Sequence, residues 1–127
     1  MNFPTAVTTC FKKYATFSGR APRSEYWYWK LFYVIVMCPL EIASRPVEDV
    51  SNIALAIDVA YAMVALMLLL PSLSVGVRRL HDIDRSGWWM LLGLIPLIGW
   101  VILFVWSVTK GTSGDNRFGH DPLAQRG

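Results

Sequence analysis

The densest group of charged residues in this chain of 127 residues is the predicted second loop, 78–86, which begins with the segment Arg78-Arg79-Leu80-His81-Asp82. Histidine exchanges protons near neutral pH and a neighbouring carboxylate can orient its ring, so His81 and Asp82 have residue types suited to acid–base chemistry. The segment also fits a structural role. In a helix, Arg78 and Asp82 lie one turn apart and can pair, while Arg78 and Arg79 suit the phosphates of anionic lipid headgroups. We favour the structural role, and the four residues form a candidate polar site without an assigned catalytic residue.

A second charged residue is notable for its position. Asp58 is the only acidic residue clearly within an apolar segment, and an ionisable group inside a membrane is a functional candidate. It lies close enough to the end of that segment to reach water, so a structural reading has equal support. Cys10 and Cys38 form no CxxC pair, and the sequence has no metal-ligand spacing, phosphate-binding loop or catalytic triad pattern. We expect two free thiols, no metal and no cofactor.

Hydropathy indicates the elements that hold these residues. The run 87–108 contains 22 residues without a charge, and one helix of that length would extend about 33 Å, enough to cross the hydrocarbon core of a bilayer. Apolar residues make up 54% of the chain, and the 17% that are charged occur in four short stretches. This distribution is typical of membrane spans separated by loops and excludes a soluble fold. The net charge of +3, without a nucleic-acid-binding motif, indicates a lipid surface and no nucleic acid.

The chain is predicted to be an all-α membrane protein with a single membrane domain, 1–127. Its three transmembrane helices are expected at 26–43, 53–77 and 87–108. A short amphipathic helix in the N-terminal arm, 1–25, should lie in the membrane interface, because apolar side chains recur there at helical spacing. The tail, 109–127, is rich in Gly, Asp, Asn and Pro and should be a flexible extension. The side chains expected to anchor the protein at the interface are Arg20, Arg23, Trp27, Trp88 and Trp89.

The third predicted span contains Pro96 and Gly99 near its middle, so we expect a kinked helix. A re-entrant hairpin is the alternative, since two full crossings would need about twice as many residues. Three crossings would place seven Lys and Arg of the N-terminal arm and second loop on one side, and four of the first loop and tail on the other. The positive-inside rule then predicts a cytoplasmic N-terminus and separates His120, in the tail, from His81.

Glu25 lies where the first predicted span begins, at the depth where the second span ends in Arg78 and Arg79. This shared depth predicts an ion pair between Glu25 and one of the two arginines. Such a pair would hold the first span against the second.

Several short motifs carry a resemblance to a known family. In order and spacing they are Phe17-Ser18-Gly19-Arg20, Arg23-Ser24-Glu25-Tyr26-Trp27, Arg78-Arg79-Leu80-His81-Asp82, Arg85-Ser86-Gly87-Trp88-Trp89, Ile95-Pro96-Leu97-Ile98-Gly99, Asn116-Arg117-Phe118-Gly119 and Asp121-Pro122. Together they closely resemble the bacterial inner-membrane family called domain of unknown function 805, over nearly the whole chain. The resemblance implies a small multi-pass protein of the bacterial cytoplasmic membrane. It implies no activity, substrate, cofactor or catalytic residue.

Three functions are compatible with these observations. The first, which we favour, is a non-enzymatic membrane protein that packs against a second copy or against another membrane protein. The second is a subunit of an oligomeric channel or transporter, whose pathway would be lined by Asp58, Ser72 and Ser74, because three spans are too few for a pathway within one chain. The third is a membrane enzyme that acts on a lipid or another apolar substrate through His81 and Asp82.

Overall fold

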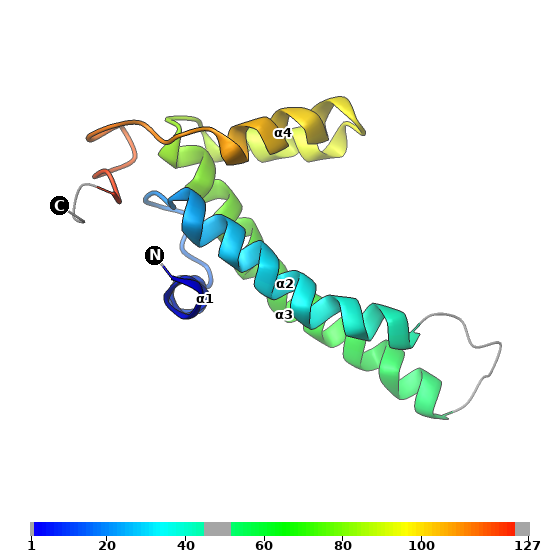
Figure 1. Cartoon of the computed structure of the whole chain (residues 1–127). Helices are drawn as coiled ribbons and strands as arrows, with labels where there is room; N and C mark the ends of the chain where they lie inside the picture. Colours follow the sequence, from blue (N-terminus) through cyan, green and yellow to red (C-terminus); the bar gives the residue numbers. More distant parts are fainter. Residues whose placement is uncertain (1, 45–51, 124–127) are drawn as a thin grey trace.

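A computed structural model describes residues 2–44 and 52–123, and this part of the chain is helical (Figure 1). The elements are α1 (Phe3–Lys12), α2 (Arg23–Ser44), α3 (Asn52–Asp82), the 3₁₀ helix η1 (Gly87–Leu94) and α4 (Ile98–Val108). The predicted all-α class is therefore confirmed for the described residues. Most of the predicted first loop, 44–52, lies outside them.

Helices α2 and α3 form a long antiparallel pair (Figure 1). They contain the first two predicted spans and extend beyond them, with Pro39 and Pro71 inside the helices. Helix α3 contains a strongly apolar stretch of 18 residues, and only 6% of that stretch is buried within the protein. It is the one helix in the described ranges that is long and apolar enough by itself to cross a membrane. An apolar helix surface that its own chain leaves uncovered is suited to lipid.

Helix α1 crosses the α2–α3 pair near one end, where Figure 1 shows it end-on. Asn2 caps its start, with the side chain accepting from the amide of Thr5 at 2.9 Å. One face of the helix is buried through Ala6 and Cys10, and Phe11 meets Trp29 of α2 edge to face at 5.2 Å. The predicted N-terminal helix is thus present and packs on the other helices through its apolar face.

The predicted single helix over 87–108, kinked near Pro96 and Gly99, is wrong. Helix η1 ends at Leu94, the chain reverses through Leu97 at φ 65°, and α4 runs back beside η1 (Figure 1). Pro96 disfavours a helical conformation at the residue before it, and Ile95 is accordingly extended. A Cβ on Gly99 would overlap the carbonyl group of Leu92, so glycine at this position permits the close return. The segment 87–108 therefore forms a helical hairpin, the shape that the alternative prediction gave it.

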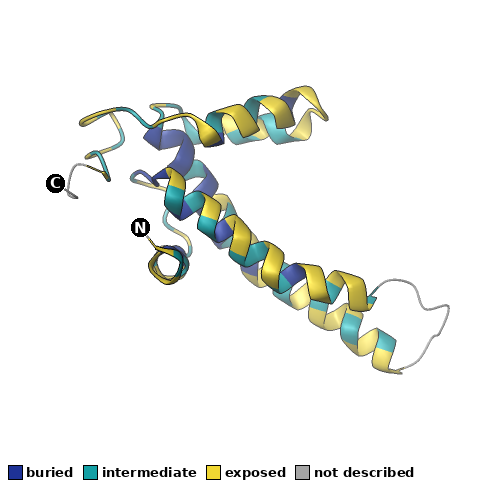
Figure 2. Ribbon diagram, in the orientation of Figure 1, coloured by how far each residue is buried: buried dark blue, intermediate teal, exposed yellow. Residues whose placement is uncertain are grey.

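Buried residues gather where α3 ends, beside the start of α2 and the segment 13–22 (Figure 2). The far halves of α2 and α3 are mostly exposed. The charged last turn of α3 is buried, whereas its apolar turns are not. This reversal of the usual arrangement suits a protein whose apolar helices are surrounded by lipid.

Candidate functional site

The candidate site is the last turn of α3, in which all five residues of 78–82 are buried. Asp82 accepts from two arginines: its Oδ1 lies 3.0 Å from Arg20 Nε, and its Oδ2 lies 2.7 Å from Arg79 Nη1. Arg20 comes from the segment before α2, so this carboxylate joins two parts of the chain. The predicted pair of Arg78 with Asp82 is wrong, because the neighbouring Arg79 pairs with Asp82 three residues on.

The tail lies against the same site. The amide of Thr112 donates to the carbonyl of Asp82 at 2.7 Å, and Arg20 donates to the carbonyls of Thr112 and Gly114 at 2.5 and 2.7 Å. Asn116 donates from Nδ2 to the carbonyl of His81 at 2.9 Å. The prediction that the tail lies on the opposite side from this turn is therefore wrong. Because α4 runs back beside η1, the chain returns to the end of α3, and the tail can contact it.

Arginine and tryptophan side chains hold the C-terminal end of α4. Arg79 donates from Nε to the carbonyl of Ser107 at 3.2 Å and from Nη2 to that of Thr109. Trp27 donates to the same Ser107 carbonyl at 3.2 Å, and Arg23 donates to that of Val108 at 3.1 Å. The last carbonyls of a helix lack partners within the helix, and cations there also face the negative end of its dipole.

A second ion pair joins α2 to α3. Arg78 Nη1 lies 2.5 Å from Glu25 Oε1, and both side chains are at most 1% exposed. This contact confirms the predicted pair of Glu25 with Arg78. Cys10 approaches the same carboxylate, with Sγ 3.8 Å from Oε1; burial and the Glu25 charge raise the pKa of the thiol to about 12. Arg78, Glu25, Arg20, Arg79 and Asp82 form what we call the ion-pair cluster.

His81 lies beside this cluster but is held by other groups. Its Nδ1 is 2.9 Å from the carbonyl oxygen of Gly19, and its ring stacks on Phe118 at 3.9 Å with an interplanar angle of 1°. A carbonyl oxygen only accepts, so Nδ1 carries the hydrogen. The proposed orientation of His81 by Asp82 is wrong, because the two Asp82 oxygens bind arginines and Gly19 orients the ring. Nothing in the sequence singled out this carbonyl, whereas Phe118 stands in a motif.

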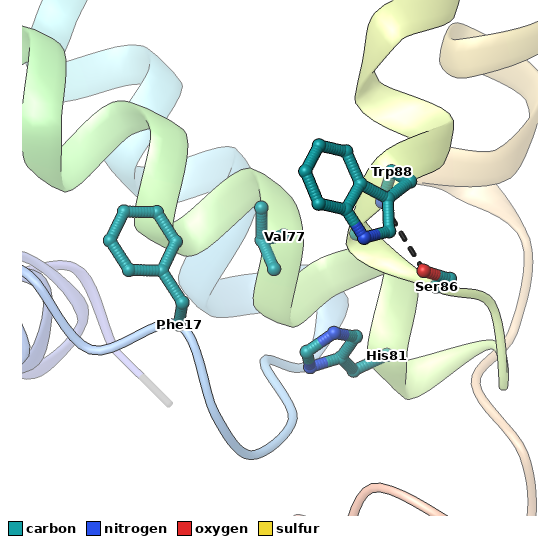
Figure 3. Close-up of a pocket in the computed structure, with 6 residues that line it drawn as sticks. Phe17, Val77, His81, Ser86 and Trp88 are labelled. Atoms are coloured by element: carbon teal, nitrogen blue, oxygen red, sulfur yellow. Dashed lines mark hydrogen bonds between the residues drawn. The ribbon is translucent and has the colours of Figure 1, made fainter.

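A cavity of about 450 Å³ opens beside His81, between the end of α3 and the start of η1. Its walls include Phe17, Val77 and Trp88 (Figure 3). Ser86 and Gly87 complete the lining. A ligand can therefore reach His81 through this cavity, and a smaller cavity of about 160 Å³ lies beside Arg79 and Leu80.

The remaining predicted residues lie apart or serve other roles. Arg20 does not face lipid headgroups as expected, because it is buried against Asp82. Trp88 and Trp89 are exposed on η1. Asp58 is exposed on α3 near the end opposite the site. His120 pairs with Asp115 on the surface of the tail. The tail lies at the same end of the molecule as His81. Within the described ranges, no three His, Cys, Asp or Glu side chains are grouped as metal ligands would be.

Comparison with known proteins shows the family to which this chain belongs. Residues 14–120 match the family described as "Protein of unknown function (DUF805)". The inner membrane protein YhaI of Escherichia coli (strain K12) is 43% identical over 113 residues, covering 87% of this chain and 89% of that protein. The inner membrane protein YhaH of the same strain is 41% identical over 111 residues, covering 87% and 90%. No solved structure matches significantly. The chain therefore belongs to the DUF805 family, whose relatives here are bacterial inner membrane proteins.

Proposed function

We propose that this protein acts as an interaction protein within the bacterial cytoplasmic membrane, where its apolar helix faces pack against a second copy or another membrane protein. The observation that carries the proposal is the uncovered apolar surface of α2 and α3. Large side chains that are at least 48% exposed along these two helices are Leu31, Val34, Ile35, Ile42, Ile53, Leu55, Val59, Met63, Leu66, Met67 and Leu69. Packing between such surfaces associates helices in lipid.

In the proposed arrangement, α2 and α3 cross the membrane and the η1–α4 hairpin enters without crossing. Eight residues of a 3₁₀ helix and eleven of an α-helix each extend about 16 Å, half the thickness of the hydrocarbon core. This matching length supports a re-entrant hairpin in place of a third crossing. The tail then lies on the same side as the N-terminal arm.

The distribution of positive charge supports the orientation. Nine of the ten Lys and Arg in the described ranges belong to elements at the end that holds the ion-pair cluster, and the tenth, Lys30, lies in α2. Because cytoplasmic segments carry the excess of Lys and Arg, both the N-terminal arm and the tail are assigned to the cytoplasm. Anionic headgroups on that face would attract the exposed members of this set.

Asp58 favours a channel or transporter subunit as the second candidate. It is an exposed carboxylate on an otherwise apolar helix surface, and an assembly of several copies would shelter it from lipid. Ser72 and Ser74, the other residues expected to face a pathway, have partners within the chain: Ser72 accepts from Trp29 Nε1 at 2.9 Å, and Ser74 donates to Pro71 at 3.0 Å. Asp58 alone therefore supports this function.

Extraction of the protein in nanodiscs of native lipid tests the packing proposal. Each nanodisc that contains this protein should also contain a second polypeptide, either another copy of the chain or a different membrane protein. Exchange of exposed Leu66 for Asn should reduce that association, whereas Leu123→Asn, in the tail, is the matched control with an exposed leucine outside the helices. Particles that contain one copy of the chain and no other protein would overturn the proposal.

Single cysteines test the arrangement in the membrane. Three exposed positions are suitable in a chain that carries Cys10→Ala and Cys38→Ala: Thr8 on α1, Asn52 at the start of α3 and Asp115 in the tail. A membrane-impermeant thiol reagent should label positions 8 and 115 from the cytoplasmic face and position 52 from the other. Labelling of 8 and 115 from opposite faces would instead require a third crossing.

A further inference from the structure

The cavity beside His81 has the size and lining of a small-molecule site. Its volume of about 450 Å³ falls within the range of roughly 300–1,000 Å³ that ligand pockets occupy. Phe17, Val77 and Trp88 give it apolar walls, and Figure 3 shows Val77 between the other two side chains. An apolar cavity with few polar groups selects an apolar ligand and orients it by those groups.

His81 supplies a fixed hydrogen-bond acceptor. Its Nδ1–H donates to Gly19 and its ring stacks on Phe118, so both the tautomer and the plane of the ring are set from outside the cavity. The other ring nitrogen, Nε2, faces the cavity (Figure 3). In the neutral ring this atom carries a lone pair and accepts. No group in the described ranges donates to it.

Ser86 supplies a hydrogen-bond donor. Its Oγ accepts from the amide of Trp88 at 3.3 Å, which caps the start of η1. The hydroxyl hydrogen is not used in that contact and can be donated to a ligand. The lining thus combines one acceptor and one donor with apolar walls, which is the complement of a hydroxyl group on an apolar body.

The distribution of charge around the cavity disfavours an anionic ligand. No Lys or Arg lines the cavity. Each nearby arginine is directed to another partner: Arg78 and Arg79 to Glu25 and Asp82, Arg85 to the Trp106 ring, and Arg117 to Asp84. A phosphate or carboxylate would therefore enter an apolar space without a cation. A ligand with an uncharged head group avoids the free-energy cost of burying a charge without a partner.

We propose that this cavity binds an uncharged amphiphile whose head is a hydroxyl group, with His81 Nε2 accepting the hydroxyl hydrogen and Ser86 donating to its oxygen. Trp88 is 79% exposed, so the apolar body of the ligand can leave the cavity beside it. Two sources share this chemistry: an aliphatic alcohol lipid such as a diacylglycerol, and a phenol with an alkyl chain. The site goes beyond the proposed packing function and does not depend on it.

Binding to the full-length purified protein in detergent tests the site with two probes, 1,2-dioctanoylglycerol and 4-octylphenol. Each is compared with its own methyl ether, which keeps the apolar body and loses the hydroxyl hydrogen. At least one alcohol should bind about tenfold more tightly than its ether, as expected for one hydrogen bond to a fixed acceptor. The probe that shows this preference identifies the source. Equal binding of alcohol and ether for both probes would overturn the proposal.

A histidine exchange with a matched control gives a second test. His81→Phe keeps a flat ring against Phe118 and removes Nε2, so the preference for the alcohol should fall to about onefold. His120→Phe, which replaces an exposed histidine in the tail, should leave it unchanged. If His81→Phe does not fold, the ¹⁵N resonance of Nε2 in the native protein replaces it. That resonance should shift with the alcohol and not with the ether, and an equal response to both would contradict the assignment.

Discussion

Arg78 of α3 and Glu25 of α2 form a buried ion pair in which Nη1 and Oε1 lie 2.5 Å apart. The other two nitrogens of this guanidinium, Nε and Nη2, are buried without a hydrogen-bond partner in the described residues. A buried cation with an incomplete set of partners depends strongly on the carboxylate that remains. Glu25 therefore carries most of the compensation for Arg78.

Removal of the Glu25 charge should be strongly destabilising. Glu25→Gln leaves Arg78 buried and uncompensated, which costs about 3 kcal/mol or more and should be measurable as a lower unfolding temperature in detergent and lower accumulation in the membrane. Reversal of both charges, Glu25→Arg with Arg78→Glu, should restore part of what either single reversal removes. A Glu25→Gln protein as stable as the native one, or a double reversal no better than the single ones, would contradict the role of this pair.

Loss of the Asp82 charge should release the tail as well as destabilise the fold. Asp82→Asn leaves Arg20 and Arg79 without their carboxylate, with an expected cost of about 3 kcal/mol or more. Hydrogen exchange at the amide of Thr112, which donates to the Asp82 carbonyl, should accelerate because the segment loses its anchor through Arg20.

Asp84→Asn is the matched control for that experiment. Asp84 pairs with Arg117 at 3.3 Å, but the two side chains are 48% and 61% exposed. An exposed ion pair contributes little, so the change in unfolding free energy should stay below about 1 kcal/mol. Equal effects of the two exchanges would show that burial does not distinguish the pairs.

Cys10 should resist alkylation in the folded protein. Its pKa, raised to about 12, leaves the group a thiol at neutral pH, and the reactive thiolate forms only as the pH approaches that value. In a protein whose sole cysteine is Cys10, the alkylation rate should be roughly a hundredfold or more below that of a protein whose sole cysteine replaces exposed Thr8. The two rates should converge in denaturant, and equal rates in the folded state would place Cys10 on the surface.

The sequence predicted those features that depend on local pattern or on shared depth in the membrane. Apolar periodicity located α1, continuous apolar runs located α2 and α3, and the common depth of Glu25 and Arg78 predicted their pair. Asp82 was misassigned because a helix offers partners at both three and four residues. The choice between Arg78 and Arg79 depends on where Glu25 and Arg20 lie, which is tertiary information.

The third span shows how one local error propagated. Pro96 and Gly99 were recognised as a disturbance, but a kink and a full reversal share the same local signal. The reversal depends on contact between Gly99 and Leu92, and between Trp89 and Trp106, whose rings lie 5.7 Å apart. A single helix over 87–108 would carry the tail away from the last turn of α3, so the contacts of the tail with Arg20 and His81 could not be foreseen.

The hairpin itself should depend on the absence of a side chain at position 99. Gly99→Ala would bring a Cβ into the Leu92 carbonyl, and because that neighbour is backbone, α4 must move away from η1. We expect a lower unfolding temperature together with faster exchange at Thr112, since displacement of α4 also moves the end that Arg79 holds. Gly93→Ala is the control within the same hairpin, because its Cβ would meet only Leu103 at an ordinary 3.7 Å. If residues 87–108 formed one continuous helix, alanine would instead stabilise it at both positions, since alanine has the higher helix propensity.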